Sequence, residues 1–236
     1  ILTLPRLIAG GLTVAFLTAL LTISAATASA NEPIPTPSTT ADPSTPPVSR
    51  DVEFPLRPED QGALISVLHD RLTWLGYSLS SDEVIDQTYG LSTQRALTAL
   101  QKKFWLPIDR YVTRKSWDRI KGIAGPIGQL PTACTSKESI CISTKQKLVR
   151  WVSDGKVAMS ADARFGMPET ATARGTFSVA RKSRDHVSSL YRTAMPFSLF
   201  FHGGQAVHYS AYFKRDGYYG ASHGCVNLRD YAKAQQ

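Results

Sequence analysis

The sequence of 236 residues predicts two folded parts, a small bundle of three helices followed by a mostly-β domain. In the first part, leucines recur at helical spacing, at Leu64, Leu68, Leu72 and Leu75. In the second part, the pair Asp154-Gly155 separates two short apolar runs, which is typical of a β-hairpin. The hydrophobic fraction of 42% excludes a wholly disordered chain, and the length allows one large or two small domains.

The first 58 residues lack the pattern of a folded domain. Residues 1–30 hold one charged side chain, Arg6, followed by a long apolar run and small residues at 28–30, which is the layout of a signal peptide. Residues 31–58 contain eight of the 14 prolines, with Ser and Thr between them, and this composition favours an extended linker. We therefore expect export, with the membrane contacted only through the N-terminal segment, whether that segment is cleaved or kept as an anchor.

Three helices are expected in residues 59–122. The first carries the leucine stripe and ends at Gly76, since glycine commonly terminates helices. The second is capped by Ser92 or Thr93, and the third starts at Thr113. Further inward-facing positions of the second and third helices are Leu97, Leu100, Phe104, Trp117 and Ile120.

Residues 123–139 are rich in glycine and proline and form a joint to the second domain, residues 140–236. Short apolar runs separated by glycines predict a mostly-β domain here. The expected strands are 147–152 and 156–159 around the hairpin turn, followed by 176–179, 197–201 and 206–208.

The positive charge is concentrated in the last part of the chain. Residues 31–143 carry 12 basic and 13 acidic side chains, whereas residues 144–236 carry 14 basic and 6 acidic ones. The last segment therefore supplies +8, which equals the formal charge of the whole chain. A basic surface attracts polyanions, and the alternative is a solvated face that aids solubility. Export argues against nucleic acid as the partner.

The three cysteines divide into a pair and a single residue. Six residues separate Cys134 from Cys141, which suffices for a small disulfide-closed loop in an exported protein, and two free thiols are the alternative. Cys225 remains, with His223 two positions before it. In an extended strand these two side chains share a face, so the imidazole can take the thiol proton and leave a nucleophilic thiolate.

Neighbouring residues of Cys225 fit such a site. Gly224 allows close approach, Ser222 and Asn227 can orient the site by hydrogen bonds, and the amides at Gly224 and Cys225 can form an oxyanion hole. The alternatives are a buried structural cysteine and a structurally bonded histidine. The five histidines show no spacing typical of zinc, so neither a metal nor a cofactor is expected.

Part of the helical region resembles the three-helix peptidoglycan-binding module. The matching positions are Leu72-x-x-Leu75-Gly76-Tyr77, Tyr89-Gly90-x-Ser92-Thr93-x-x-Ala96-Leu97, Gln101 and Thr113-x-x-x-Trp117. The family usually has Asp-Gly at its two turns, where this chain has Asp86-Gln87 and Asp109-Arg110. A helical spacer without a ligand is the alternative.

The C-terminal domain resembles the L,D-transpeptidases, which cross-link bacterial peptidoglycan. The resemblance rests on Ser222-His223-Gly224-Cys225-Val226-Asn227, on the upstream His208 and on the flanking segments 200–208 and 216–221. It implies an L,D-transpeptidase-like β-sandwich, with substrate contacts from His208, Asn227 and Tyr219. The family normally continues with a helix and a closing strand beyond the position of Gln236. We therefore expect a truncated catalytic domain.

The resemblance also implies a reaction. Cys225 attacks the carbonyl that precedes the terminal D-Ala of a tetrapeptide stem, and His223 activates the thiol and then protonates the leaving amine. The amine of a second stem resolves the thioester into a 3→3 cross-link. Peptidoglycan stem peptides are thus the expected partners, and anionic wall polymers are candidates for the basic domain. Two alternatives stay open: an L,D-carboxypeptidase that uses water, and a non-catalytic wall-binding protein.

Overall fold

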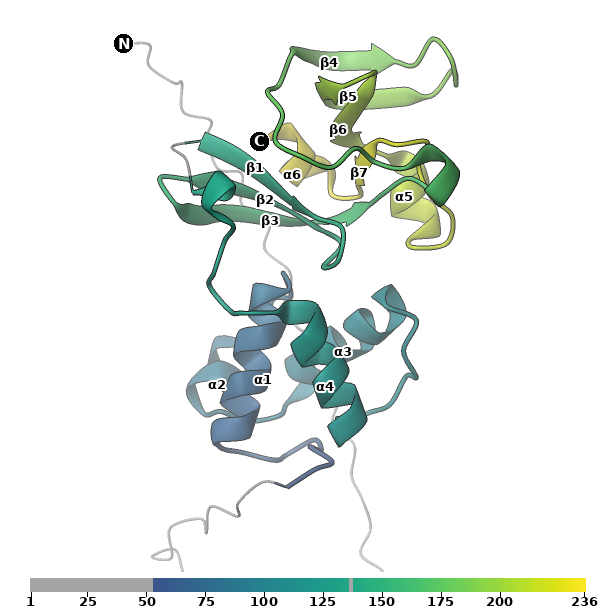
Figure 1. Ribbon diagram of the computed structural model, residues 1–236. Coiled ribbons are helices and arrows are strands. Elements are labelled where there is room, and N and C mark those ends of the chain that lie inside the picture. The colour runs from purple at the N-terminus through teal and green to yellow at the C-terminus, as the bar shows by residue number, and fades with distance from the viewer. Residues whose placement is uncertain (1–52, 136–137) are drawn as a thin grey trace, which may run out of the picture. The chain divides into compact units, whose positions relative to one another are not determined.

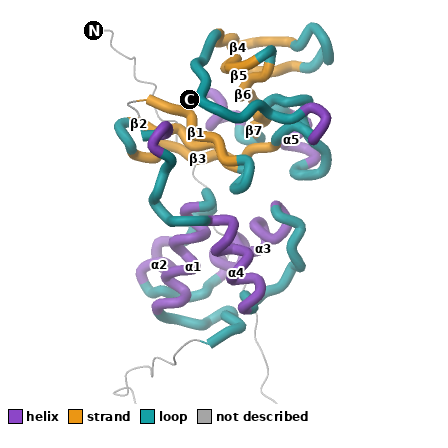
Figure 2. The backbone as a smooth tube through the Cα atoms, viewed as in Figure 1, coloured by secondary structure: helices purple, strands orange, loops and turns teal. Residues whose placement is uncertain are grey.

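The computed structural model describes residues 53–135 and 138–236, which all fall in one compact unit spanning residues 47–236. The predicted signal peptide and most of the linker lie outside the described residues. A group of helices is followed along the chain by a sheet with a few short helices (Figures 1 and 2). Within the described ranges, no helix is long and apolar enough to cross a membrane.

The helical part contains four helices where three were expected. They are α1 (Ala63–Trp74), α2 (Ser81–Ile85), α3 (Leu91–Lys103) and α4 (Arg114–Ala124). The extra helix is the five-residue α2, which buries no side chain and therefore leaves no apolar stripe for a sequence pattern to detect. The expected inward positions pack together in one core, with Leu68, Leu72, Leu97, Leu100 and Ile120 fully buried.

The start of α3 differs from the expected cap. Gly90 is the N-cap residue, and the carboxylate of Glu83 accepts hydrogen bonds from the backbone N–H groups of Ser92 (2.6 Å) and Thr93 (2.9 Å). A Cβ atom on Gly90 would lie 2.5 Å from the Glu83 side chain, so glycine is what admits this carboxylate. A side chain from the preceding helix thus satisfies the orphan donors that a local Ser or Thr was expected to satisfy.

This cap makes the helical part sensitive to acid. Burial alone would raise the pKa of Glu83, but hydrogen bonds from Ser92 and Thr93 outweigh it and lower the pKa to about 2. The stabilisation is therefore present above the unfolded-state pKa and is lost as pH falls toward about 2. We expect Glu83→Gln to cost about 0.5–2 kcal/mol at neutral pH and to flatten this acid dependence, measured by thermal unfolding across pH. The exposed Glu53→Gln is the matched control, and equal curves for both variants would contradict the assignment.

The second part is built on one curled sheet rather than on two separate packed sheets. Its strands are β1 (Glu138–Ser143), β2 (Leu148–Ser153), β3 (Lys156–Arg164), β4 (Arg181–Val187), β5 (Ala194–His202), β6 (Gln205–Tyr209) and β7 (Val226–Leu228). The order is β1-β2-β3-β7-β6-β5-β4, so the last strand in the chain lies in the middle of the sheet. Neighbouring strands are antiparallel except β6 and β7, which are parallel.

The parallel pairing follows from the segment that joins β6 to β7. This connection contains α5 (Ala211–Asp216) and the Ser-His-Gly-Cys turn, and it is long enough to bring β7 back in the direction of β6. A last helix, α6 (Tyr231–Gln235), follows β7, and two short 3-10 helices lie at Thr132–Cys134 and Pro168–Thr170. The central strands pack a small core of Val149, Ala161, Ala163, Val207, Val226 and Leu228.

One hairpin prediction is confirmed and one strand prediction is wrong. Asp154 (φ 47°) and Gly155 (φ 73°) form the two-residue turn between β2 and β3. Residues 176–179 are not a strand but part of the loop between the 3-10 helix Pro168–Thr170 and β4. Phe177 packs its ring on Phe201 and on His202 of β5, so its apolar character serves a loop contact rather than a sheet face.

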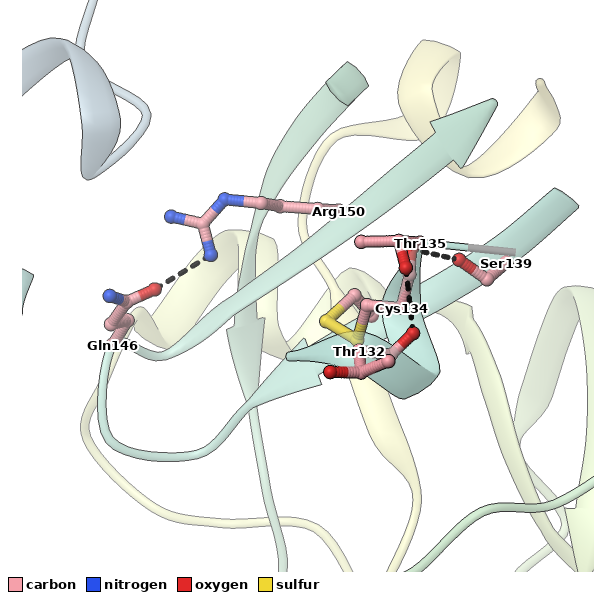
Figure 3. Close-up of a disulfide and its surroundings, with 7 residues drawn as sticks. Thr132, Cys134, Thr135, Ser139, Gln146 and Arg150 are labelled. Carbon is pink, nitrogen blue, oxygen red and sulfur yellow. Dashed lines mark hydrogen bonds between the residues drawn. A yellow bond between two sulfur atoms is a disulfide. The ribbon is translucent and has the colours of Figure 1, made fainter. Parts of the chain in front are cut away.

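A disulfide between Cys134 and Cys141 joins the first 3-10 helix to β1 (Figure 3). Two nearby hydrogen bonds hold the same corner: the Ser139 hydroxyl donates to the Cys134 carbonyl (2.8 Å), and the Thr135 hydroxyl donates to the Thr132 carbonyl (2.8 Å). The bridge closes a short loop, so it fixes local geometry more than it restricts the unfolded chain.

Candidate active site

The segment Ser222–Cys225 forms a tight turn, not an extended strand. The Ser222 hydroxyl donates to the Cys225 carbonyl (2.6 Å) and accepts from the Gly224 N–H (3.2 Å). Gly224 has φ of +109°, and β7 begins only at Val226. The premise that His223 and Cys225 share one strand face is therefore wrong, because the turn sets the direction of each side chain separately.

Two glycines allow other loops to approach this turn closely. A Cβ on Gly224 would lie 2.6 Å from Nε2 of Gln205, and a Cβ on Gly166 would lie 1.9 Å from the Thr170 carbonyl and 2.9 Å from the Gly224 nitrogen. Gly166 also forms a parallel bridge with Ser222. The turn is thus held between the residues that follow β3 and the start of β6, with no room for added side-chain atoms.

Gln205 is a site residue that sequence reasoning missed. Its side-chain oxygen accepts from the Ala173 N–H (2.9 Å), and its Nε2 donates to the Ala171 carbonyl (3.1 Å). The same amide packs against Gly224. Gln205 therefore ties the 171–173 loop to the Ser222–Cys225 turn, and no local pattern in the sequence signals such a long-range contact.

Replacing Gly224 with alanine should disable the turn without unfolding the chain. The new Cβ meets Gln205, and the positive φ adds about 1–3 kcal/mol of backbone strain. We expect slower alkylation of Cys225 by a neutral thiol reagent, with thermal unfolding that remains cooperative. Gly122→Ala is the matched control, because a Cβ there meets nothing within 4 Å. Equal alkylation rates for the two variants would contradict the close packing described for the turn.

Cys225 carries a half-buried thiol that is not part of the disulfide. Burial raises the pKa of this thiol, and a hydrogen bond from the Ala206 backbone opposes the rise in part. The thiol is therefore protonated in the resting chain, so it needs a base at the moment of attack.

His208 lies on β6 beside the start of β7. The register pairs Val207 with Val226 and His208 with Asn227, which places Cys225 next to Ala206, two positions before His208. Partners in a parallel pair point to the same face, so the buried side chains of His208 and Asn227 lie together. The register thus places His208 two residues along β6 from the neighbour of Cys225.

The environment of His208 keeps it neutral and orients its ring. Burial lowers the pKa of His208, hydrogen bonds with the Tyr209 carbonyl and the Asn227 side chain oppose that fall, and His186 adds to it. Nδ1 lies 2.6 Å from the Tyr209 carbonyl oxygen. Because a carbonyl can only accept, the hydrogen bond places the ring proton on Nδ1 and leaves Nε2 with its lone pair.

His223 lies in a different setting. Its side chain is exposed, and its ring stacks on Tyr191 with centroids 4.2 Å apart and planes 17° apart. Tyr191 belongs to the turn between β4 and β5, a contact that sequence reasoning did not anticipate. Among the hydrogen bonds of the described residues, none joins the His223 ring to the Cys225 thiol.

The other expected site residues are placed in three different ways. Asn227 is buried and bonds to His208, and Ser222 closes the turn. Tyr219 lies elsewhere: it is 71% exposed, and its ring meets the edge of Trp105 from the helical part with centroids 4.6 Å apart. No group of three or more His, Cys, Asp or Glu side chains able to hold a metal ion occurs within residues 53–135 and 138–236.

Comparison with known proteins assigns this part of the chain. Residues 137–235 match the family model described as the YkuD L,D-transpeptidase catalytic domain. These residues form an L,D-transpeptidase domain. The matched residues include the Ser222–Cys225 turn, His208 and β7. No curated protein matches the chain significantly.

Several solved structures of L,D-transpeptidases are similar to the chain. The enzyme of Xylanimonas cellulosilytica is 27% identical, with 79% of this chain and 91% of that chain covered and a TM-score of 0.46. The enzyme of Stackebrandtia nassauensis is 22% identical, with 78% and 90% covered and a TM-score of 0.46. The enzyme of Mycobacterium smegmatis is 26% identical, with 38% and 47% covered and a TM-score of 0.35.

Proposed function

We propose that the chain is an exported cysteine L,D-transpeptidase that forms 3→3 cross-links between peptidoglycan stem peptides. The observation that carries the proposal is the thiol of Cys225, set in a glycine turn directly before β7, whose parallel register with β6 brings it to the strand that carries the buried, neutral His208. A thiol nucleophile served by a neutral imidazole is an arrangement that supports acyl transfer.

The proposed reaction begins with a neutral thiol and a neutral imidazole. The pKa of Cys225 is raised and the pKa of His208 is lowered, so a preformed thiolate–imidazolium pair is disfavoured. The proton moves to the imidazole as sulfur attacks the carbonyl carbon that precedes the terminal D-Ala. The tetrahedral intermediate collapses, the C–N bond breaks, and the proton goes to the leaving D-Ala amine. A thioester on Cys225 remains.

In the second half of the reaction the thioester transfers the acyl group. The side-chain amine of a diamino acid in a second stem attacks the thioester carbonyl, the imidazole takes the amine proton, and the thiol of Cys225 is regenerated. If water takes the place of the amine, the product is a tripeptide stem and the enzyme is an L,D-carboxypeptidase. The two functions share every step up to the thioester.

Two histidines are candidates for the base. His223 was expected in this role, but the structure puts its ring against Tyr191 at the surface. His208 has the fixed tautomer and the buried position that favour a general base. We therefore assign proton transfer at the thiol to His208, and we assign the exposed His223, with Tyr191, to contact with the stem peptide. The Gly224 N–H already donates to Ser222, so the Cys225 amide is the better candidate for the oxyanion.

We also propose that the helical part binds peptidoglycan. An open groove of about 610 Å³ runs along α3 and the 108–110 segment, and it is lined by Gln94, Arg95, Thr98, Ala99, Lys102, Ile108, Asp109 and Arg110. Its charged side chains suit a ligand with carboxylates, because three of them are cations and one is an anion. The groove includes Asp109-Arg110, where the module family usually has Asp-Gly, so binding is best tested directly.

Product analysis tests the proposed function. The chain is incubated with a purified disaccharide-tetrapeptide, and the products are separated and weighed by mass spectrometry. Release of D-Ala with a 3→3 dimer supports the transpeptidase, and release of D-Ala with tripeptide alone makes the chain a carboxypeptidase. Binding to isolated sacculi without either product would make it a wall-binding protein without catalysis.

A salt titration of binding to sacculi tests the partner of the basic domain. Binding that weakens as the salt concentration rises would support electrostatic attraction to anionic wall polymers.

A further inference from the structure

The C-terminal end of α3 reaches the segment from Tyr219 to Arg229 directly at Tyr219, and at Arg229 through Asp162 of β3. Lys103, the last residue of α3, pairs with Asp162 of β3, and Asp162 also pairs with Arg229, the residue directly after β7. Two residues farther along, Trp105 packs against Tyr219, which lies three positions before Ser222. The segment from Tyr219 to Arg229 holds the turn, Cys225 and β7, so its two ends are both reached from the helical part.

The first contact is a buried ion network. The Lys103 side chain is 2% exposed, and its Nζ lies 2.6 Å from Oδ1 of Asp162, whose side chain is 16% exposed. Lys147 adds a further link, since its Nζ donates to the Lys103 carbonyl (3.0 Å). Asp162 is thus a partly buried carboxylate shared by a buried cation, Lys103, and a cation that is 41% exposed, Arg229.

The network bears on β7 because that strand is short. β7 has three residues, and its registry with β3 pairs Leu228 with Ala163 and Asn227 with Arg164. Asp162 directly precedes Ala163, and Arg229 directly follows Leu228. The ion pair between Asp162 and Arg229 therefore adds a side-chain contact at the next position of the β3–β7 pairing. Asn227 in turn bonds to His208. Lys103 therefore helps to hold β7 through Asp162. This strand positions the Cys225 thiol and Asn227, the partner of the proposed base His208.

The second contact depends on an unusual backbone. Trp105 has φ of +54°, which is rare for an aromatic residue, and the Leu106 N–H holds this conformation by donating to the Gln101 carbonyl (2.9 Å). The conformation brings the Trp105 ring onto Tyr219. The Tyr219 carbonyl is held from the other side by Nη1 of Arg164 (3.0 Å).

We infer that Lys103 and Trp105 are positioning residues, through which the helical part sets the geometry of the catalytic segment from both of its ends. The inference rests on Cys225 being the nucleophile of the proposed function. The helical part thus has a role beyond binding the wall: without its contacts the thiol, the turn and His208 lose their alignment. The groups that face Lys103 in this network are Asp162, Arg229, Lys147, Tyr77 and Tyr218.

Alkylation of Cys225 by iodoacetamide tests the inference without requiring turnover. Cys225 is the single cysteine outside the disulfide, so labelling of the full chain reports on this thiol alone. We expect Lys103→Met and Trp105→Ala each to change the alkylation rate of Cys225 by roughly tenfold, because small displacements of a reacting atom have large effects. The pH profile of the alkylation rate should change as well. Lys103→Arg should restore most of the wild-type profile, since it keeps the cation.

The control is Lys115→Met, an exposed lysine on α4, which should leave the profile unchanged. Trp105 is 56% exposed, so its alanine variant is expected to fold even if Lys103→Met does not, and then the Trp105 profile decides. Wild-type rates and pH profiles in folded Lys103→Met and Trp105→Ala would overturn the inference. A wild-type chain that alkylates normally but releases no D-Ala would instead contradict the proposed function, which separates the two outcomes.

Discussion

Cys225→Ala should form no covalent adduct with a carbapenem, whereas the wild-type chain should gain the mass of one carbapenem molecule. The thiol opens the β-lactam ring and forms a thioester, and because no group leaves, the whole mass is added. The variant lacks the sulfur, and turnover of stem peptides should fall by roughly 10³-fold or more. Intact-protein mass spectrometry measures the adduct, and product analysis measures turnover.

The control variant removes the two disulfide cysteines and keeps Cys225. Cys134 and Cys141 are joined in the structure, so a Cys134→Ser, Cys141→Ser double variant tests whether either contributes an adduct site. It should still gain one carbapenem. An adduct that persists in Cys225→Ala, or a wild-type chain that forms none, would contradict the assignment of Cys225 as nucleophile.

His208→Gln should lower the acylation rate by about 10²–10⁴-fold, the usual contribution of a general base. Glutamine keeps a hydrogen-bonding side chain on β6 but cannot take the thiol proton. In the wild type, burial raises the pKa of the Cys225 thiol and lowers that of His208. Acylation should therefore rise with pH through the lowered pKa of His208, as the imidazole becomes neutral and able to accept a proton. Stopped-flow or quenched acylation by a carbapenem across pH measures both effects.

The matched comparison is His223→Gln. Because His223 is exposed and stacked on Tyr191, its replacement should act mainly on the concentration dependence of acylation and less on the limiting rate. Rescue of acylation in His208→Gln by small imidazoles would support a missing base. If His223→Gln lost the limiting rate and His208→Gln kept it, the roles of the two histidines would be reversed.

Local patterns predicted the elements whose cause is local. The leucine stripe of α1 and the Asp154-Gly155 turn depend on spacing and on backbone preference, and both appear in the structure. The strand expected at 176–179 failed because alternation alone does not distinguish a sheet from a loop whose Phe177 packs against β5. Elements whose structure is decided by residues near in sequence could therefore be predicted from the sequence.

Contacts between distant segments account for the rest. Glu83 caps α3 from another helix, Gln205 ties a loop to the catalytic turn, and Tyr191 covers His223 from a different hairpin. The Ser-His-Gly-Cys motif predicted a site at these residues, and its extended-strand interpretation was wrong because Gly224 bends the chain. The pairing of His208 with Asn227 follows from the parallel register of β6 and β7, which no single-sequence pattern specifies.

We expect Cys225 to accept the acyl group of a tetrapeptide stem with release of D-Ala. The most direct measurement is intact-protein mass spectrometry of the wild-type chain, quenched in acid soon after mixing with a tetrapeptide donor whose own acceptor amine is blocked. We expect a mass gain equal to the mass of the donor minus that of D-Ala, located on the peptide that contains Cys225. An unmodified chain, when D-Ala is released at the same time, would contradict the thioester, and so would the same mass gain in Cys225→Ala.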